Sequence, residues 1–198
     1  TALGVFLGVK AAAKRALNVD SLTDVHVAIQ GVGSVGGGLA KLLAEEGARL
    51  TLADVNADRA QELAAEYGGE AVDTDSILSV EADIVSPNAL GAVLDEESIS
   101  QLRCSAVAGG ANNQLATPED GQRIYERGIL FAPDYVINAG GIINVGLEYL
   151  GQGDEQEVKA RIAKIPDRLE QVWQESAECG DPAADVADRI ARRLIARS

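Results

Sequence analysis

The sequence predicts an α/β fold: a doubly wound, mostly parallel sheet with helices on both faces and C-terminal helices packed against it. Short segments rich in β-branched residues alternate with helical segments from residue 24 to residue 137, as in parallel strands joined by crossover helices. Hydrophobic residues make up 46% of the 198 residues and aromatic residues 4%, so we expect a sizeable, aliphatic core. No internal repeat or Pro/Ser-rich linker divides the chain, which favours one domain.

The expected elements form three parts: a leading helix over residues 1–17, a core over 24–150, and C-terminal helices over 154–198. Strands are predicted within 24–30, 48–56, 82–90 and the start of 104–115, with two short extended pieces within 129–141. Helices are predicted in the second half of 31–47, at 57–69, ending within 98–103, and at 117–128, 154–178 and 182–197. Thr117 and Pro118 provide the N-cap and first position of the helix at 117–128.

The composition excludes several function classes. A formal net charge of −14 repels nucleic-acid phosphates and suits neither a nucleic acid nor an anionic membrane as partner. No apolar run reaches the roughly 18 residues of a spanning helix, and no signal peptide opens the chain. Cys104 and Cys179 lack metal-ligand spacing and are expected to be reduced thiols of a cytoplasmic protein. A chain that begins at Thr1 and contains no methionine is expected to be a piece of a longer protein.

The single histidine, His26, lies inside a predicted strand. This position disfavours Ser-His-Asp chemistry and histidine-based metal sites, so we expect a structural role for His26 and no metal.

The segment GVGSVG, residues 31–36, follows a predicted strand and opens a predicted helix. In this context the pattern indicates a Rossmann-type dinucleotide-binding turn. Gly31 permits the tight turn, Gly33 lets a pyrophosphate approach the backbone, and Gly36 lets the helix pack on the sheet. The N–H groups at the start of the helix suit the phosphates. The alternative is a glycine-rich turn without a ligand.

Asp54 closes the next strand, 18 residues after Gly36. A carboxylate there accepts hydrogen bonds from the ribose hydroxyls of NAD and repels the 2′-phosphate of NADP. Arg59 allows three interpretations. It could favour the 2′-phosphate of NADP, it could flank the adenine, or it could be a solvated helix residue paired with a neighbouring acid.

Two further loops, 86–94 and 108–115, follow predicted strands. Ligands of open α/β sheets bind outside the carboxyl ends of the strands, which would make Asn112 and Asn113 face a cleft. The alternative is a loop in which asparagine tolerates the left-handed conformation.

These segments together resemble the cofactor domain of the Glu/Leu/Phe/Val amino acid dehydrogenases, closest to the leucine, valine and phenylalanine branch. The similarity covers essentially the whole chain. It is carried by the motifs TALGV (1–5), VAIQGVGSVG (27–36), ADVN (53–56), NALGAVL (88–94), AGGANNQL (108–115), GILFAPDYVINAGGIINV (128–145) and ADRIA (187–191).

The resemblance implies oxidative deamination of an L-amino acid to a 2-oxo acid and ammonia, with NAD as cofactor and a branched-chain or other apolar amino acid as substrate. It also implies a homo-oligomeric full-length protein. Carried over by position, the cofactor contacts are Thr1, Gly31, Val32, Gly33, Ser34, Val35, Gly36, Gly37, Gly38, Asp54, Val55, Arg59, Ala89, Leu90, Gly110, Ala111 and Asn112. The implied substrate contacts are Asn112, Asn138, Ile142 and Val145.

The segment Asn138-Ala139-Gly140-Gly141 is expected at the floor of the cleft, where small residues leave room for the reacting atoms. The resemblance places the catalytic lysines and aspartate in an amino-terminal substrate domain that precedes TALGV. We therefore expect no catalytic residue in this chain, and assign none of Lys10, Lys14 and Lys41 to that role.

This sequence departs from the family pattern at a few positions. Asn88 stands where the family usually has Cys, and Ile142 stands where leucine dehydrogenases have Val. Residues 109–113 read GGANN, where the family often has GSANN or GAANN. The alternative function is a stand-alone NAD-binding module without catalysis.

Overall fold

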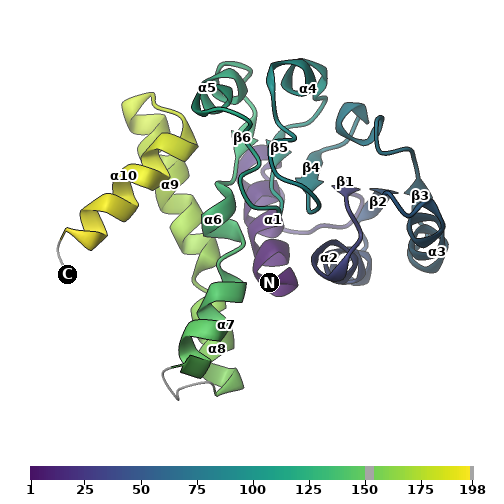
Figure 1. The fold of residues 1–198 in the computed structure, drawn as a ribbon, viewed down its shortest axis with the longest axis horizontal. Helices are drawn as coiled ribbons and strands as arrows, with labels where there is room; N and C mark the ends of the chain where they lie inside the picture. The colour runs from purple at the N-terminus through teal and green to yellow at the C-terminus, as the bar shows by residue number, and fades with distance from the viewer. Residues whose placement is uncertain (150–153, 197–198) are drawn as a thin grey trace.

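The computed structural model describes residues 1–149 and 154–196. In this part of the chain a six-stranded, entirely parallel sheet has the order β3-β2-β1-β4-β5-β6, which confirms the predicted doubly wound α/β fold (Figure 1). The strands are β1 (His26–Gln30), β2 (Arg49–Ala53), β3 (Glu70–Ala71), β4 (Ile84–Pro87), β5 (Ala106–Val107) and β6 (Leu130–Phe131).

The helices are α1 (Ala2–Leu17), α2 (Ser34–Glu45), α3 (Ala57–Tyr67), the 3₁₀ helix η1 (Ile77–Ser79), α4 (Glu96–Gln101), α5 (Pro118–Glu126), α6 (Asp134–Ile137), α7 (Gly140–Tyr149), α8 (Glu155–Ile162), α9 (Ile165–Cys179) and α10 (Ala183–Ile195). None of the helices in the described ranges is long and apolar enough to cross a membrane.

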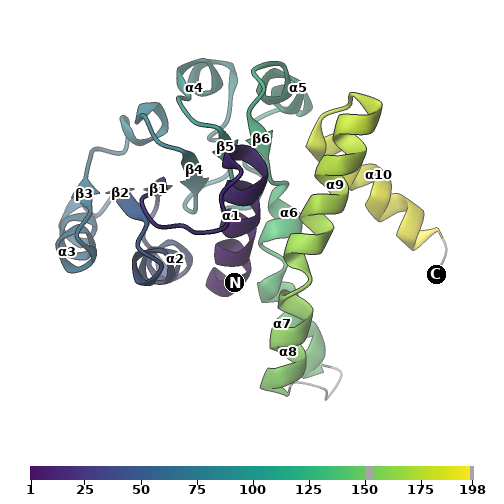
Figure 2. The ribbon, with the colours of Figure 1, turned by 180° about the vertical axis from the view of Figure 1, so that it is seen from behind.

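Alternating side chains along the strands build a core on each face of the sheet. Val27 and Ile29 of β1 belong to the cluster formed with α1, α2, α3 and α9, whereas Ala28 belongs to the cluster formed with η1, α4 and α5. The two helical layers lie on opposite sides of the sheet in Figures 1 and 2. The helices covering both faces explain why the strands read as nearly continuous apolar runs.

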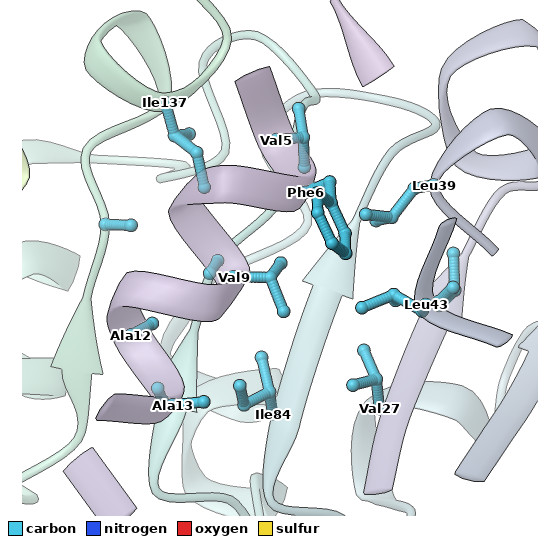
Figure 3. Close-up of a cluster of buried hydrophobic side chains, with 14 of the residues drawn as sticks. Val5, Phe6, Val9, Ala12, Ala13, Val27, Leu39, Leu43, Ile84 and Ile137 are labelled. Atoms are coloured by element: carbon cyan, nitrogen blue, oxygen red, sulfur yellow. The ribbon is translucent and has the colours of Figure 1, made fainter. Parts of the chain in front are cut away.

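The leading helix α1 lies in the middle of one face rather than beside the domain. Val5, Phe6 and Val9 point from α1 into a cluster that includes Leu39 of α2 and Ile84 of β4 (Figure 3). Full burial of each larger apolar side chain stabilises the fold by about 1.5–3 kcal/mol. This packing holds the first turn of α1 against the loop after β5, where a Cβ on Gly110 would lie 2.9 Å from Val5 Cγ2.

One prediction for the segment 129–141 is wrong. Only β6 is extended; after Pro133 the chain forms α6, where a second extended piece was predicted. Pro133 has φ = −56°, and Asp134 places an acidic side chain in the first turn of α6. The apolar run that follows is α7, which was not predicted.

The predicted long helix at 154–178 is also wrong, because the chain there forms α8 and α9. The two helices are separated at Ala163 and Lys164, and Pro166 occupies the first turn of α9. A proline at this position lacks the N–H that a continuous helix requires. Residue 150, where the predicted core ends, and residues 197 and 198 of the predicted C-terminal helices lie outside the described residues.

Candidate functional site

The carboxyl ends of β1, β2, β4 and β5 meet at one edge of the sheet, since all are parallel. The turn after β1 carries the glycine motif and the end of β2 is followed by Asp54. The loops after β4 and β5 carry residues 88–91 and 108–113. The sheet thereby gathers four of the segments that the sequence singled out.

The glycine turn is built as its sequence requires. Gly31 has φ = 86°, and its N–H donates to Ala53 O at 2.7 Å. A Cβ on Gly31 would lie 2.6 Å from Ala89 Cβ, and one on Gly36 would lie 1.8 Å from Gly31 O. By contrast, a Cβ on Gly33 would meet no atom of residues 1–149 or 154–196 within 4 Å. Gly31 and Gly36 are therefore required by the fold itself, while Gly33 borders open space.

Helix α2 begins at this open space. Its N-cap, Gly33, provides no side-chain hydrogen bond, and its first turn contains no acidic residue. The first amides of a helix have no partner within the helix and carry a partial positive charge. The end of α2 thus presents to an anion donors that have no partner among residues 1–149 and 154–196. Gly37 and Gly38 instead allow close packing, since added Cβ atoms would lie 3.1 Å from Val32 O and 3.0 Å from Ala2 Cβ.

Asp54 is fixed by two backbone amides. Its Oδ2 accepts a hydrogen bond from Val32 N at 2.7 Å and its Oδ1 accepts one from Asn56 N at 2.9 Å. A carboxylate offers about four acceptor positions, so the group still has capacity for ribose hydroxyls. The Val32 N–H is already bonded to Asp54, and the Val32 side chain is fully buried.

The neighbours of Asp54 point outward. Val55 is 92% exposed, and the Arg59 side chain forms no ion pair with any residue of 1–149 or 154–196. The backbone N–H of Arg59 donates to Asn56 Oδ1, the N-cap of α3, at 3.2 Å.

Asn88 links the loops after β4 and β5. Its Nδ2 donates to Ser86 O and Ser86 Oγ, both at 2.9 Å, and its Oδ1 accepts from Gly110 N at 2.9 Å. Beyond it, Leu90 is 74% exposed, whereas Ala111 is buried.

The two adjacent asparagines after β5 have different surroundings. Asn113 adopts φ = 52°, and its N–H donates to Asp134, so it follows the loop-geometry alternative. Asn112 is exposed, and its Oδ1 accepts a hydrogen bond from Asn138 Nδ2 at 2.6 Å. The fold therefore brings together two of the predicted ligand contacts, which lie 26 residues apart in the sequence.

The segment from Asn138 to Gly141 joins α6 to α7, next to the start of the chain. A Cβ on Gly141 would lie 2.8 Å from Thr1 Oγ1, and one on Gly140 would lie 3.5 Å from Thr1 Cα. In α1, a Cβ on Gly8 would lie 2.3 Å from Ile137 Cγ1. These glycines let α1 pack directly against α6 and α7, a role that the sequence did not reveal.

Ile142 and Val145 lie one turn apart on α7 and are 76% and 64% exposed. Side chains three residues apart share one helix face. The two apolar side chains thus form an exposed apolar surface that begins next to Asn138.

Other features lie outside this edge. A cavity of about 680 Å³, lined by residues including Cys104, Tyr125 and Trp173, opens near the amino ends of β5 and β6. Within the ranges that the structure describes, no three His, Cys, Asp or Glu side chains are grouped so that they could hold a metal ion. His26 Nε2 lies 2.8 Å from Thr51 Oγ1 of the neighbouring strand, and burial lowers its pKa.

Comparison with known proteins places the chain in a family. The model of the Glutamate/Leucine/Phenylalanine/Valine dehydrogenase family matches residues 51–197. The chain belongs to this family. It is 46% identical over 195 residues to leucine dehydrogenase from Thermoactinomyces intermedius, covering 98% of this chain and 53% of that protein. It is 40% identical over 200 residues to phenylalanine dehydrogenase from Bacillus thermotolerans, covering 98% and 52%. The chain thus spans about half the length of the curated relatives that it matches.

The fold of this family member is also found in solved structures. The crystal structure of L-tryptophan dehydrogenase from Nostoc punctiforme superposes with a TM-score of 0.95 at 39% identity, covering 100% of this chain and 60% of that one. A hetero-hexameric glutamate dehydrogenase from Thermus thermophilus shares the fold with a TM-score of 0.73 at 22% identity, covering 100% and 53%.

Proposed function

We propose that residues 1–198 form the NAD-binding domain of an L-amino acid dehydrogenase. The intact protein would oxidise a branched-chain or other apolar L-amino acid to a 2-oxo acid and ammonia. The observation that carries the proposal is the juxtaposition of an open helix N-terminus at Gly33 with Asp54 and with the Asn112–Asn138 pair, all at one edge of the sheet. NAD bound at this edge would supply the hydride acceptor for the oxidation.

The cofactor contacts follow from this edge. The amides at the start of α2 would hold the pyrophosphate, because they have no partner in the described part of the chain and a pyrophosphate can approach over Gly33. Asp54 would accept the ribose hydroxyls and disfavour a 2′-phosphate, which favours NAD over NADP. Arg59 and Val55 border the adenosine side.

The substrate would lie between Asn112, Asn138 and the exposed face of α7. Asn112 offers a hydrogen-bonding side chain there, whereas Ile142 and Val145 offer only apolar surface. An apolar wall suits an aliphatic side chain, and it provides no partner for a glutamate γ-carboxylate. The leucine, phenylalanine and tryptophan dehydrogenases among the relatives act on apolar amino acids by name, in agreement with such a wall.

The chemical step would require groups outside these residues. A lysine that activates water needs a lowered pKa, but the carboxylate of Asp20 raises the pKa of Lys14. Lys10 pairs with Glu46 at 3.0 Å, across α1 and the end of α2. We therefore propose that the catalytic residues lie in a substrate domain of the intact, homo-oligomeric protein.

A substrate panel tests the proposal. The intact protein is assayed with NAD and each of L-leucine, L-valine, L-phenylalanine and L-glutamate, while the 198-residue chain alone is titrated with NADH in a calorimeter. We expect turnover of aliphatic substrates by the intact protein, and NADH binding without turnover by the chain. An intact protein that binds NADH but oxidises no amino acid would favour the alternative, an NAD-binding module without catalysis.

A further inference from the structure

Gly110 is held on both sides by asparagine side chains. Its N–H donates to Asn88 Oδ1 at 2.9 Å, and its carbonyl oxygen lies 3.4 Å from Asn138 Nδ2. Asn88 is itself anchored to Ser86 of β4, while Asn138 caps the end of α6. The loop that carries Asn112 is thereby tied to two separate elements.

The chemistry of these partners determines which way each carboxamide faces. A carbonyl oxygen only accepts hydrogen bonds, so the atom of Asn138 that faces Gly110 O has to be Nδ2. The same nitrogen has a second hydrogen, which it donates to Asn112 at 2.6 Å. The atom of Asn112 that faces Asn138 is therefore the acceptor, Oδ1.

The opposite end of the Asn112 carboxamide is then its Nδ2. Asn112 is exposed, and within residues 1–149 and 154–196 its Nδ2 has no hydrogen-bond partner. The side chain thus presents two N–H donors to the open edge of the sheet.

We propose that Asn138 is a positioning residue that fixes the orientation of the Asn112 carboxamide, so that Asn112 donates a hydrogen bond to an oxygen acceptor of the ligand. Asn88 supports the same orientation by holding Gly110 from the other side. The inference rests on the proposed function. In an amino acid dehydrogenase, the oxygen that accepts from Asn112 Nδ2 is either in the substrate carboxylate or in the carboxamide of the nicotinamide.

Asn138→Asp tests the orientation with almost no change in side-chain volume. A carboxylate cannot donate, so it would repel Gly110 O and Asn112 Oδ1, and Asn112 would turn its Nδ2 towards residue 138. The ligand oxygen would then meet Asn112 Oδ1. We expect kcat/KM of the intact protein for its best substrate to fall at least about 10-fold, because the ligand oxygen loses a donor and meets a second oxygen. The fall should reach about 100-fold if the acceptor is the charged substrate carboxylate.

Asn138→Ala removes the hydrogen bond that orients Asn112 but does not turn the Asn112 carboxamide round. The fall in kcat/KM should therefore be smaller than for Asn138→Asp. A purely structural role would instead make the alanine variant at least as damaging, because it leaves a gap. Asn18→Asp is the matched control: it adds the same charge at the far end of α1 and should leave kcat/KM unchanged. Melting temperatures of all variants show whether each one folds.

A double-mutant cycle decides whether Asn138 acts through Asn112. In an Asn112→Ala background, the effect of Asn138→Asp should shrink to less than about threefold. Full additivity of the two substitutions would overturn the proposal. So would equal kcat/KM values for Asn138→Asp and the wild-type protein.

Fluorescence titration with NADH locates the acceptor in the same variants. A raised KM for the amino acid at unchanged NADH affinity assigns the acceptor to the substrate, and weakened NADH binding assigns it to the cofactor. Either result supports the orientation. If the wild-type intact protein oxidises no amino acid, the proposed function fails and the inference fails with it. If the protein is active but the effects of the Asn112 and Asn138 substitutions are additive, only the inference fails.

Discussion

A Cβ atom on Gly36 would lie 1.8 Å from the carbonyl oxygen of Gly31, so helix α2 crosses the turn after β1 at backbone contact. Neither atom belongs to a flexible side chain, so the contact cannot relax without moving α2 from the sheet. We expect Gly36→Ala to destabilise the chain by about 3 kcal/mol or more and to lower the melting temperature by about 6–12 °C.

Gly33→Ala is the matched variant in the same turn. The added methyl group meets open space, so stability is lost only because alanine is a poorer N-cap residue than glycine. We expect a loss of about 1 kcal/mol and a melting temperature lower by about 2–4 °C. We expect this variant to fold but to bind NADH at least about tenfold more weakly, because the methyl group occupies the approach to the α2 amides. Calorimetric titration and thermal melts check both variants. NADH binding by Gly33→Ala at wild-type affinity would place the pyrophosphate elsewhere.

The carboxylate of Asp54 should determine cofactor preference. We expect the wild-type chain to bind NADH more tightly than NADPH, and Asp54→Ser to narrow the difference by removing the repulsion of a 2′-phosphate. The measurement is the ratio of the two dissociation constants for each protein. Asp58→Ser, in the first turn of α3, is a control for the loss of a charge nearby. An NADPH preference in the wild-type chain would show that Arg59 outweighs Asp54.

The exposed side chain of Ile142 should limit substrate size in the intact protein. Relative to valine, isoleucine adds one methylene, which is worth roughly 1–3 kcal/mol in an apolar pocket. We expect L-valine to match or exceed L-leucine in kcat/KM, and Ile142→Ala to shift the preference towards larger side chains by about tenfold. A substrate panel on both proteins measures this. An unchanged ranking in the variant would remove Ile142 from the pocket wall.

The two thiols should differ in reactivity. Burial raises the pKa of Cys104 to about 11, whereas Cys179 is exposed at the end of α9. Because only the thiolate reacts, we expect a disulfide reagent at pH 7.5 to label Cys179 at least about a hundredfold faster than Cys104 in the folded chain. Both should react at once in denaturant. Equal rates under native conditions would mean that the region around Cys104 opens readily.

The shape of the glycine turn after β1 could be predicted from the sequence because its determinants are local. The positive φ of Gly31 and the start of α2 at Ser34 follow from residues within one short segment. The strand alternation similarly placed apolar side chains on both faces of the sheet. The single helix predicted at 154–178 is wrong because Pro166 interrupts an otherwise periodic pattern. The spacing of apolar residues does not show that the proline lacks a backbone N–H.

What only the tertiary structure decided is which polar side chains meet. Asn112 and Asn138 lie 26 residues apart, and Asn88 and Gly110 lie 22 apart, so no local pattern connects them. Their contacts exist because β4 and β5 are neighbours in a parallel register and because α6 turns back over the same edge of the sheet. The sequence by itself determined the fold and the kinds of residue at the site. The orientation of each carboxamide was decided by long-range packing, because a hydrogen bond depends on where both partners are held.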